Sequence, residues 1–251
     1  MREIAAVAAA ETLPRFRQGT TIDNKLSAGF DPVTEADRAA ERAIREVIRA
    51  RFPDHSILGE EYGLVNGGAV HQWVIDPIDG TRAFISGLPV WGTLVGLTVD
   101  GDAVAGLMSQ PFTGELYYAD ATGAYYEGPG GGRRLATRRV TDLSEATLFT
   151  TTPSLFRGNA RALYDRLESG VRLARYGADC YAFAMVAGGS VDIVTDPGLQ
   201  SYDIVALIPI IEQAGGVVTT FDGRPAEAGG DVLAAATPEL HEKAMRVLAG
   251  Q

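Results

Sequence analysis

The sequence predicts one α/β unit in which an antiparallel meander is followed by alternating strands and helices. Three observations support this fold class: a helical apolar stripe over residues 36–52, extended runs between residues 73 and 119, and strand and helix patterns that alternate after residue 146. With 251 residues, 46% of them apolar, the chain is long enough for a sizeable core. We expect an N-terminal half, residues 1–140, and a C-terminal half, residues 141–251, packed as one compact unit.

The first predicted element is a helix over residues 36–52 (ADRAAERAIREVIRARF). Its apolar positions recur with helical spacing opposite an Arg/Glu face: Ala36, Ala40, Ala43, Ile44, Val47 and Ile48. Thr34 and Asp37 stand at the spacing of a capping box. Four extended segments follow, at residues 73–76, 93–99, 103–110 and 115–119. Asp-Gly and Phe-Thr-Gly turns between them predict an antiparallel meander.

The second half alternates between the two periods. Short extended runs are expected at residues 146–151, 191–195, 217–221 and 232–236, and helices at residues 159–169, 179–187, 203–214 and 238–248. The glycine-rich stretch Gly128–Arg134 (GPGGGRR) lacks the Gly-Lys-Ser/Thr ending of a phosphate-binding loop, and we interpret it as a hairpin connection. The boundary between the halves is expected between this stretch and Ala146.

Composition excludes several classes of protein. The single cysteine, Cys180, rules out an intrachain disulfide framework, and three scattered histidines argue against a histidine-rich zinc site, so any metal must sit on oxygen ligands. A net charge of −10 argues against nucleic acid as a partner. No apolar run reaches the roughly 18 to 20 residues of a membrane helix, and the N-terminal residues lack the layout of a signal peptide. We therefore expect a cytoplasmic protein without a membrane partner.

Carboxylates stand at the ends of several predicted elements. Glu60 and Glu61 follow a short apolar run, Asp76 and Asp79 close the next strand, and Asp203 opens a helix. Carboxylates that converge repel one another unless a cation neutralises them, and oxygen ligands of this kind suit Mg²⁺. The pattern predicts a divalent-cation site.

Each of these carboxylates also has a local interpretation. Asp203 can be the N-terminal charge of its helix, and Asp37 can complete the capping box with Thr34. Glu60 and Glu61 suit a surface turn, and Asp76 suits a strand end. Taken one at a time, the residues leave both interpretations open.

The combination of motifs is more specific. Asp76-Pro-Ile-Asp-Gly-Thr81 resembles the signature of the inositol monophosphatase superfamily, which consists of lithium-sensitive, Mg²⁺-dependent phosphatases. Gly59-Glu60-Glu61 precedes it and Tyr202-Asp203-Ile-Val-Ala follows it, in the family's order. The resemblance extends from about Lys25 to Gly223 and includes Asp31-Pro-Val-Thr-Glu-Ala-Asp37. It implies a layered αβαβα sandwich and a homodimer.

The resemblance also implies a role for each matching residue. The metal ligands would be Glu60, Asp76, the main-chain carbonyl of Ile78, Asp79 and Asp203, holding two or three Mg²⁺ ions for which Mn²⁺ can substitute. Glu61 would help to position a water molecule for a third ion. Lys25 would add positive charge near the metals.

The remaining implied roles concern the reaction, which is metal-assisted, in-line hydrolysis of a phosphate monoester without a covalent enzyme intermediate. Thr81 and Asp37 would orient and deprotonate the attacking water. The amides of Gly80 and Thr81 would cradle the phosphate, because glycine allows a close approach and a helix starting at Thr81 offers free N–H groups.

The substrate is suggested by further segments that resemble the histidinol-phosphate phosphatase branch, among them Thr150-Thr-Thr-Pro-Ser-Leu-Phe156 and Tyr176-Gly-Ala-Asp-Cys-Tyr181. Asp179 and Asp196 would pair with the ammonium group of histidinol, which a polyol lacks. That branch more often has Glu at position 196, and the shorter Asp reaches about one methylene less far. The alternative substrates are inositol 1-phosphate and a broad range of sugar phosphates.

Two other classes of function are alternatives to catalysis. A non-catalytic ligand-binding protein on this fold would be expected to lack Thr81, Asp37 or a metal carboxylate, and all of these are present. An assembly role through dimerisation is the second alternative. The sequence favours an enzyme whose partner is a small phosphate monoester.

Overall fold

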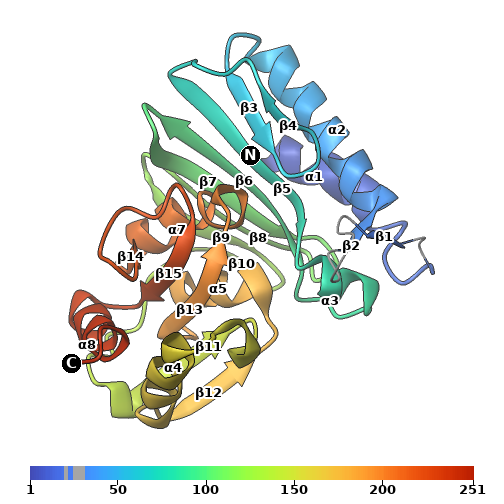
Figure 1. The fold of residues 1–251 in the computed structure, drawn as a ribbon. Helices are drawn as coiled ribbons and strands as arrows, with labels where there is room; N and C mark the ends of the chain where they lie inside the picture. The colour runs from blue at the N-terminus through green and yellow to red at the C-terminus, as the bar shows by residue number, and fades with distance from the viewer. Residues whose placement is uncertain (20–21, 25–31) are drawn as a thin grey trace.

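The computed structural model describes residues 1–19, 22–24 and 32–251 of the chain. Two large sheets and the helices around them stack in five layers: helices, an eight-stranded sheet, helices, a five-stranded sheet and helices (Figure 1). The predicted layered αβαβα sandwich is therefore confirmed. The division at residue 140 remains a prediction, although the eight-stranded sheet ends before it and the five-stranded sheet begins after it.

The eight-stranded sheet contains the predicted meander. In spatial order its strands are β10 (Gly131–Arg134), β9 (Gly123–Gly128), β8 (Glu115–Asp120), β7 (Asp102–Gln110), β6 (Gly92–Val99), β5 (His71–Asp79), β3 (Ser56–Gly59) and β4 (Gly63–Val65). All neighbours pair antiparallel except β3 and β5. The glycine-rich stretch forms the β9–β10 hairpin, as predicted. A separate two-stranded ribbon consists of β1 (Ile22–Asn24) and β2 (Pro32–Thr34).

The five-stranded sheet belongs to the second half. Its spatial order is β12 (Leu173–Tyr176), β11 (Thr147–Thr150), β13 (Ile193–Leu199), β15 (Gly230–Ala235) and β14 (Val217–Thr220). Successive residues of a strand point to opposite faces. Thus Ile193 packs toward the outer helices and Val194 toward the middle layer. Both faces of this sheet are covered, which explains its continuous apolar runs.

The helices cover the sheets in three layers. The layer on the eight-stranded sheet contains α1 (Arg2–Thr12) and α2 (Glu35–Arg51); α5 (Asp179–Ala187), α6 (Ser201–Ile204) and α7 (Leu207–Gln213) lie between the sheets; α4 (Asn159–Ser169) and α8 (Pro238–Leu248) cover the far face. A short helix, α3 (Thr81–Ile85), and two 3-10 turns (Leu143–Glu145 and Pro153–Leu155) complete the described elements. α1 was not predicted, although buried Ile4, Ala8 and Thr12 repeat every four residues.

The middle layer packs directly on the backbone of the eight-stranded sheet. A Cβ atom added to Gly106 of β7 would lie 1.9 Å from the carbonyl oxygen of Ala206, and one added to Gly96 of β6 would lie 2.7 Å from Val205. Glycine is therefore required at both positions, because any side chain would push the junction of α6 and α7 away from the sheet. This close contact brings the N-terminus of α6, with Asp203, toward the end of β5.

Several predicted bounds were wrong, among them the strand expected over residues 191–195, which is β13 (Ile193–Leu199), and two others concern site residues. The helix expected over residues 203–214 begins two residues earlier and is divided into α6 and α7. Pro209 explains the division, because proline has no N–H to continue the ladder from α6 but is tolerated in the first turn of α7. The strand expected to end at Asp76 continues to Asp79 as β5.

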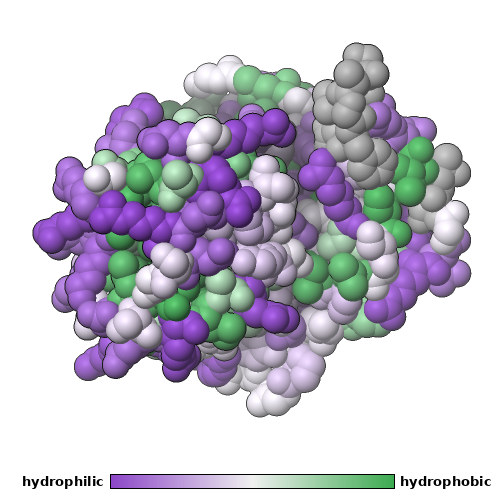
Figure 2. Space-filling view, turned by 60° about the horizontal axis from the view of Figure 1, so that its bottom comes forward, coloured by the Kyte–Doolittle hydropathy of each residue, from purple (hydrophilic) through white to green (hydrophobic). Residues whose placement is uncertain are grey.

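Hydrophilic residues predominate on the face that Figure 2 shows, and hydrophobic residues are scattered among them. Within the described ranges, no helix combines the length and the apolar character that crossing a membrane requires.

Candidate active site

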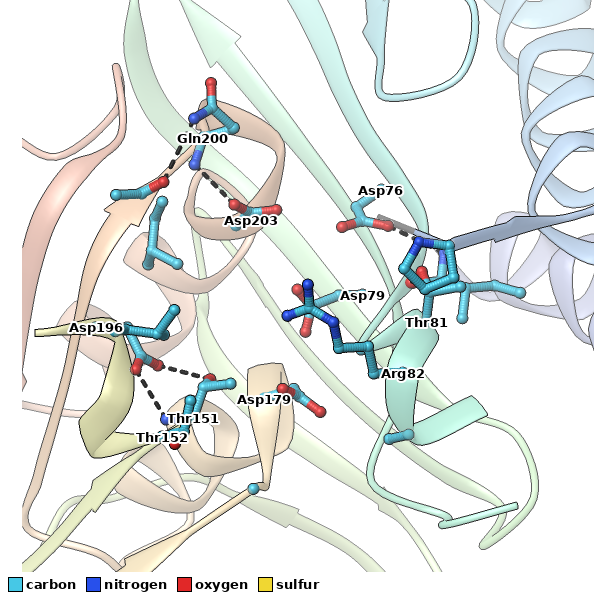
Figure 3. Close-up of a pocket in the computed structure, with 18 of the residues that line it drawn as sticks. Asp76, Asp79, Thr81, Arg82, Thr151, Thr152, Asp179, Asp196, Gln200 and Asp203 are labelled. Carbon is cyan, nitrogen blue, oxygen red and sulfur yellow. Dashed lines mark hydrogen bonds between the residues drawn. The ribbon is translucent and has the colours of Figure 1, made fainter. Parts of the chain in front are cut away.

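A cavity of about 710 Å³ lies where the end of β5 and α3 face β13, α5 and α6. Figure 3 shows acidic side chains from these separate elements directed into it. Among the residues that the structure describes, six carboxylate residues line it: Glu60, Asp76, Asp79, Asp179, Asp196 and Asp203. A concave site with convergent polar groups is the usual form of a ligand or catalytic site.

A β-bulge explains how Asp76 and Asp79 come to serve the same site. Side chains three positions apart on a regular strand point to opposite faces of the sheet. Here Asp76 pairs with Leu94 and Asp79 with Gly92, so β5 contains one extra residue between the two pairs. The extra residue restores both carboxylates to one side, and a bulge is also a position where a strand tolerates Pro77.

Three of the predicted metal ligands form a compact cluster. Asp76, Asp79 and Asp203 each offer a carboxylate oxygen, and these oxygens lie within 4.8 Å of one another. Burial, together with the charges of Glu60 and the other two aspartates, raises the pKa of Asp76 well above its usual value. Burial and the charge of Glu60 raise the pKa of Asp203 to about 7. The cluster is costly to ionise without a counter-charge.

The cluster fits a hard divalent cation. All three ligands are oxygen atoms, and carboxylates that repel one another in a buried site are the donor set that Mg²⁺ neutralises. Local contacts also hold the side chains in place: Asp76 Oδ1 accepts the Ile78 amide at 3.0 Å, and Asp79 Oδ2 accepts the Cys180 amide at 2.7 Å. The residues present can therefore hold a metal ion.

The raised pKa values predict how the metal-free protein responds to pH. The pKa of Asp203 is about 7 in the folded state and 3.8 in its ordinary state. A raised pKa means that the folded state binds this proton more tightly than the unfolded state does. The contribution of protonated Asp203 to the free energy of unfolding is therefore fully present below pH 3.8 and is lost as pH rises through 7. In metal-stripped protein, we expect Asp203→Asn to have the wild-type melting temperature near pH 4 and a higher one near pH 8. Equal melting temperatures at both pH values, measured by calorimetry, would contradict this account of the cluster.

Asp37 combines both interpretations that the sequence left open. It completes the capping box of α2, because its Oδ2 accepts the Thr34 amide at 2.8 Å and the Thr34 hydroxyl at 2.6 Å. Its Oδ1 lies 3.4 Å from the hydroxyl of Thr81. Burial raises the pKa of Asp37. The cap holds the carboxylate still, and its other oxygen faces Thr81.

Asp203 likewise serves as a helix cap and as a cavity residue. Its Oδ2 accepts the Gln200 amide at 2.7 Å in a capping box at the start of α6. Figure 3 shows its carboxylate directed across the cavity toward Asp76. The local and the metal-binding interpretations are therefore compatible.

Gly80 and Asp179 are in direct contact. Gly80 has φ 82°, and a Cβ atom built on it would lie 2.8 Å from Asp179 Oδ2. Glycine is thus required both by the left-handed backbone and by the space that Asp179 occupies. Asp179 itself has φ 43°, which is rare for a residue with a side chain and characteristic of functional sites. Burial raises the pKa of Asp179.

Asp196 is held by a group of threonines that sequence reasoning did not single out as functional. Its Oδ1 accepts the Thr150 hydroxyl at 2.6 Å and the Thr151 amide at 2.8 Å, and its Oδ2 accepts the Thr151 hydroxyl at 3.0 Å. Burial raises the pKa of Asp196 to about 6. These bonds fix the carboxylate at the cavity wall.

The other predicted site residues do not all line the cavity. Ile78 lines the cavity, and its carbonyl oxygen accepts the Thr81 hydroxyl at 3.1 Å. Glu60 lines the cavity, whereas Glu61 does not; the Glu61 amide is bound to Glu41 instead. Lys25 lies outside the described residues.

Further cavity residues were missed by the sequence analysis. Arg82 lines the cavity, and Figure 3 shows its guanidinium directed inward. Its position immediately after the phosphatase motif was the available signal. Leu88 and Leu155 are 53% and 38% exposed and form an apolar part of the wall. The sequence gives no indication that these leucines line a cavity, because their sequence context is the same as that of any leucine on a protein surface.

Comparison with known proteins agrees with the geometry. A model of the inositol monophosphatase family matches residues 1–250. The chain is 38% identical over 236 residues to a chloroplastic bifunctional phosphatase of Arabidopsis thaliana, covering 87% of this chain and 66% of that protein. It is 37% identical over 207 residues to a histidinol-phosphatase of Chlorobaculum parvum, covering 82% of this chain and 78% of the relative.

A solved structure of an inositol monophosphatase from Zymomonas mobilis has the same fold. Its TM-score to this chain is 0.87 at 37% identity, over 99% of this chain and 95% of that one. The family that the motifs suggested is confirmed across nearly the full length. The chain is a phosphatase of the inositol monophosphatase family.

Proposed function

We propose that the chain is a Mg²⁺-dependent phosphomonoesterase that hydrolyses L-histidinol phosphate to L-histidinol and phosphate, a step of histidine biosynthesis. The observation that carries the proposal is the presence of two acidic groups in one cavity. Asp76, Asp79 and Asp203 suit divalent cations, and Asp179 and Asp196 add negative charge elsewhere on the wall. A phosphate ester with a cationic organic part is complementary to both groups.

Glu60, Asp76, Asp79, Asp203 and the Ile78 carbonyl are the proposed metal ligands. When bound, Mg²⁺ supplies positive charge for the phosphoryl and leaving oxygens and activates water for attack. The predicted number of ions is two or three, and Mn²⁺ is expected to substitute because it accepts the same oxygen donors. Glu61, oriented by its bonded amide, is proposed to hold a water molecule beside the site. Lys25 is proposed to add positive charge there.

Thr81 and Asp37 are proposed to act on the attacking water. The Thr81 hydroxyl is held by the Ile78 carbonyl and by Asp37, so its lone pairs can face a water molecule in the cavity. Burial raises the pKa of Asp37, which makes it a better proton acceptor than an ordinary carboxylate. The backbone N–H groups of Gly80 and Thr81, at the start of α3, are proposed to bind the phosphate oxygens.

The substrate assignment depends on Asp179 and Asp196. A carboxylate has about four lone-pair sites, and Asp196 uses three of them for Thr150 and Thr151, so acceptor capacity remains for an ammonium group. Leu88 and Leu155 offer apolar surface to a planar ring such as imidazole. An inositol ring can donate hydroxyl hydrogen bonds to these carboxylates, but it has no cation to neutralise their charge and no planar apolar face for the leucines.

The test compares two esters in one assay. Phosphate release from histidinol phosphate and from inositol 1-phosphate is measured with Mg²⁺ for the wild type, Asp179→Asn and Asp196→Asn. Losing one charge-assisted hydrogen bond costs about 1.5 to 3 kcal/mol, so kcat/KM for histidinol phosphate should fall roughly tenfold to hundredfold. Turnover of inositol 1-phosphate should hold or rise.

Equal losses on both esters would assign these aspartates to the support of the structure or the metals. A wild type that prefers inositol 1-phosphate would favour the second candidate, inositol monophosphatase, for which the Zymomonas mobilis relative is the supporting observation. The predicted homodimer is tested separately by light scattering with and without substrate, which distinguishes assembly from catalysis.

A further inference from the structure

One face of α2 carries a row of buried charged side chains that begins beside Thr81 of the catalytic cavity. Asp37, Glu41 and Arg45 follow one another at intervals of four residues and are 0%, 0% and 3% exposed. Residues at this interval lie on the same helix face. Asp37 faces Thr81, so Glu41 and Arg45 continue the row away from it along the helix.

The row ends on the turn that joins β3 to β4, which contains Glu60 and Glu61. Glu41 Oε2 accepts the Glu61 amide at 2.7 Å, and Glu41 Oε1 accepts the Tyr62 amide at 3.3 Å. Arg45 donates through Nε to Glu41 Oε1 at 2.7 Å and through Nη2 to the carbonyl of Gly63. Every residue from 61 to 63 is therefore bonded to this one pair.

Gly59 shows how closely the turn fits the pair. A Cβ atom built on Gly59 would lie 1.9 Å from Glu41 Oε1 and 2.8 Å from Arg45 Nη2. The carboxylate occupies the space that any other residue's side chain would need. The glycine of the Gly-Glu-Glu motif is thus required by Glu41.

Stability alone does not account for the pair. Burying two charges costs solvation that their attraction offsets only when the geometry is good, and apolar replacements are often as stable. Arg45 Nη1 has no hydrogen-bond partner among the described residues, which adds to the cost. Glu41 and Arg45 lie one helical turn apart, so their ion pair by itself joins only adjacent turns of α2. The pair fixes a distant part of the chain only through its hydrogen bonds to residues 61–63.

We propose that Glu41 and Arg45 are positioning residues that hold the β3–β4 turn so that Glu60 is presented to the divalent cation. The inference rests on the proposed function, in which Glu60 is a metal ligand. Glu60 is itself tied at its amide to the Ile75 carbonyl at 3.1 Å, so the turn is fixed from β5 on one side and from α2 on the other. Residues that orient metal ligands typically change metal affinity by 10- to 100-fold when replaced.

The test uses Glu41→Gln in the full chain, with Glu46→Gln as the matched control. Glutamine has the same shape as glutamate but only one acceptor oxygen. When that oxygen accepts the bond that Oε1 accepts from Arg45, the NH₂ group takes the place of Oε2 and faces the Glu61 N–H, so two donors meet and the bond to Glu61 is lost. Glu46 is on the same helix and exposed, so its replacement makes the same charge change without touching the turn. Arg45→Lys is the second variant, because one ammonium group cannot reproduce both bonds of the guanidinium fork.

Two measurements are made on each variant. Hydrogen exchange of the peptide covering residues 59–65 is followed by mass spectrometry in metal-free protein, and Mg²⁺ affinity is measured by calorimetry. In Glu41→Gln we expect exchange at the turn to accelerate and the Mg²⁺ dissociation constant to rise about tenfold or more. The control should match the wild type in both, and Arg45→Lys should shift in the same direction as Glu41→Gln.

Unchanged exchange and Mg²⁺ affinity in folded Glu41→Gln would overturn the inference. If Glu41→Gln does not fold, the same two measurements on Arg45→Lys decide. Failure of the proposed function looks different: the wild type would bind no Mg²⁺, while exchange at the turn would still separate Glu41→Gln from Glu46→Gln.

Discussion

Asp79→Asn should lower kcat by roughly three orders of magnitude or more while the protein remains folded. A metal ion stabilises the charge of the transition state by several kcal/mol. Each loss of about 1.4 kcal/mol of this stabilisation lowers the rate tenfold. Asparagine removes the charge that holds the ion but keeps a carbonyl oxygen that can accept the Cys180 amide. Turnover is measured by phosphate release at saturating Mg²⁺.

The melting temperature of the same variant provides the control. Burial and the charges of Asp203 and Asp179 raise the pKa of Asp79, so removing its charge relieves repulsion in the metal-free protein. We expect the melting temperature without metal to be equal to or higher than that of the wild type, and the increase caused by Mg²⁺ to be much smaller. Wild-type turnover in Asp79→Asn would refute its assignment as a ligand.

Thr81→Ala should lower kcat by roughly two orders of magnitude or more, with little change in phosphate binding. The substitution deletes the hydroxyl that contacts the Ile78 carbonyl and Asp37, but it keeps the backbone N–H proposed to bind phosphate. Positioned proton transfer typically contributes about 10²- to 10⁴-fold. Inhibition by inorganic phosphate measures binding independently of turnover.

Thr81→Ser is the matched variant, since serine retains the hydroxyl and loses only a methyl group. It should keep kcat within about tenfold of the wild type. An alanine variant with normal kcat and a raised KM would instead identify Thr81 as a substrate-binding residue.

Local patterns predicted much of the fold. The bounds of α4, α5 and α8 agree with the predicted helices at residues 159–169, 179–187 and 238–248. In the structure Thr237 caps α8 and Pro238 lies in its first turn, where its missing N–H costs no hydrogen bond. α1 was missed because its apolar residues are mostly alanines, which give a weak stripe.

The sequence could predict which residues belong to the candidate site, but not how their side chains are arranged. The order of the motifs singled out Asp76, Asp79 and Asp203, which the structure brings together. The β-bulge that turns Asp76 and Asp79 to one side depends on pairing with β6, which no local sequence period shows. The contact of Asp179 with Gly80 joins residues 99 positions apart and depends on the N-terminus of α5 meeting the end of β5, where the Cys180 amide donates to Asp79. Glu41 has the sequence context of any charged helix residue, because its partners, the amides of Glu61 and Tyr62, lie about 20 residues away in the chain.

The carboxylate cluster is proposed to act through bound Mg²⁺. The most direct measurement is phosphate release from histidinol phosphate by chelator-stripped protein, followed by titration with Mg²⁺ and, in parallel, Ca²⁺. We predict that activity is lost on chelation, returns with Mg²⁺ in a saturable manner, and is depressed by Ca²⁺, which prefers larger and more irregular coordination. Full turnover in excess chelator would contradict the account.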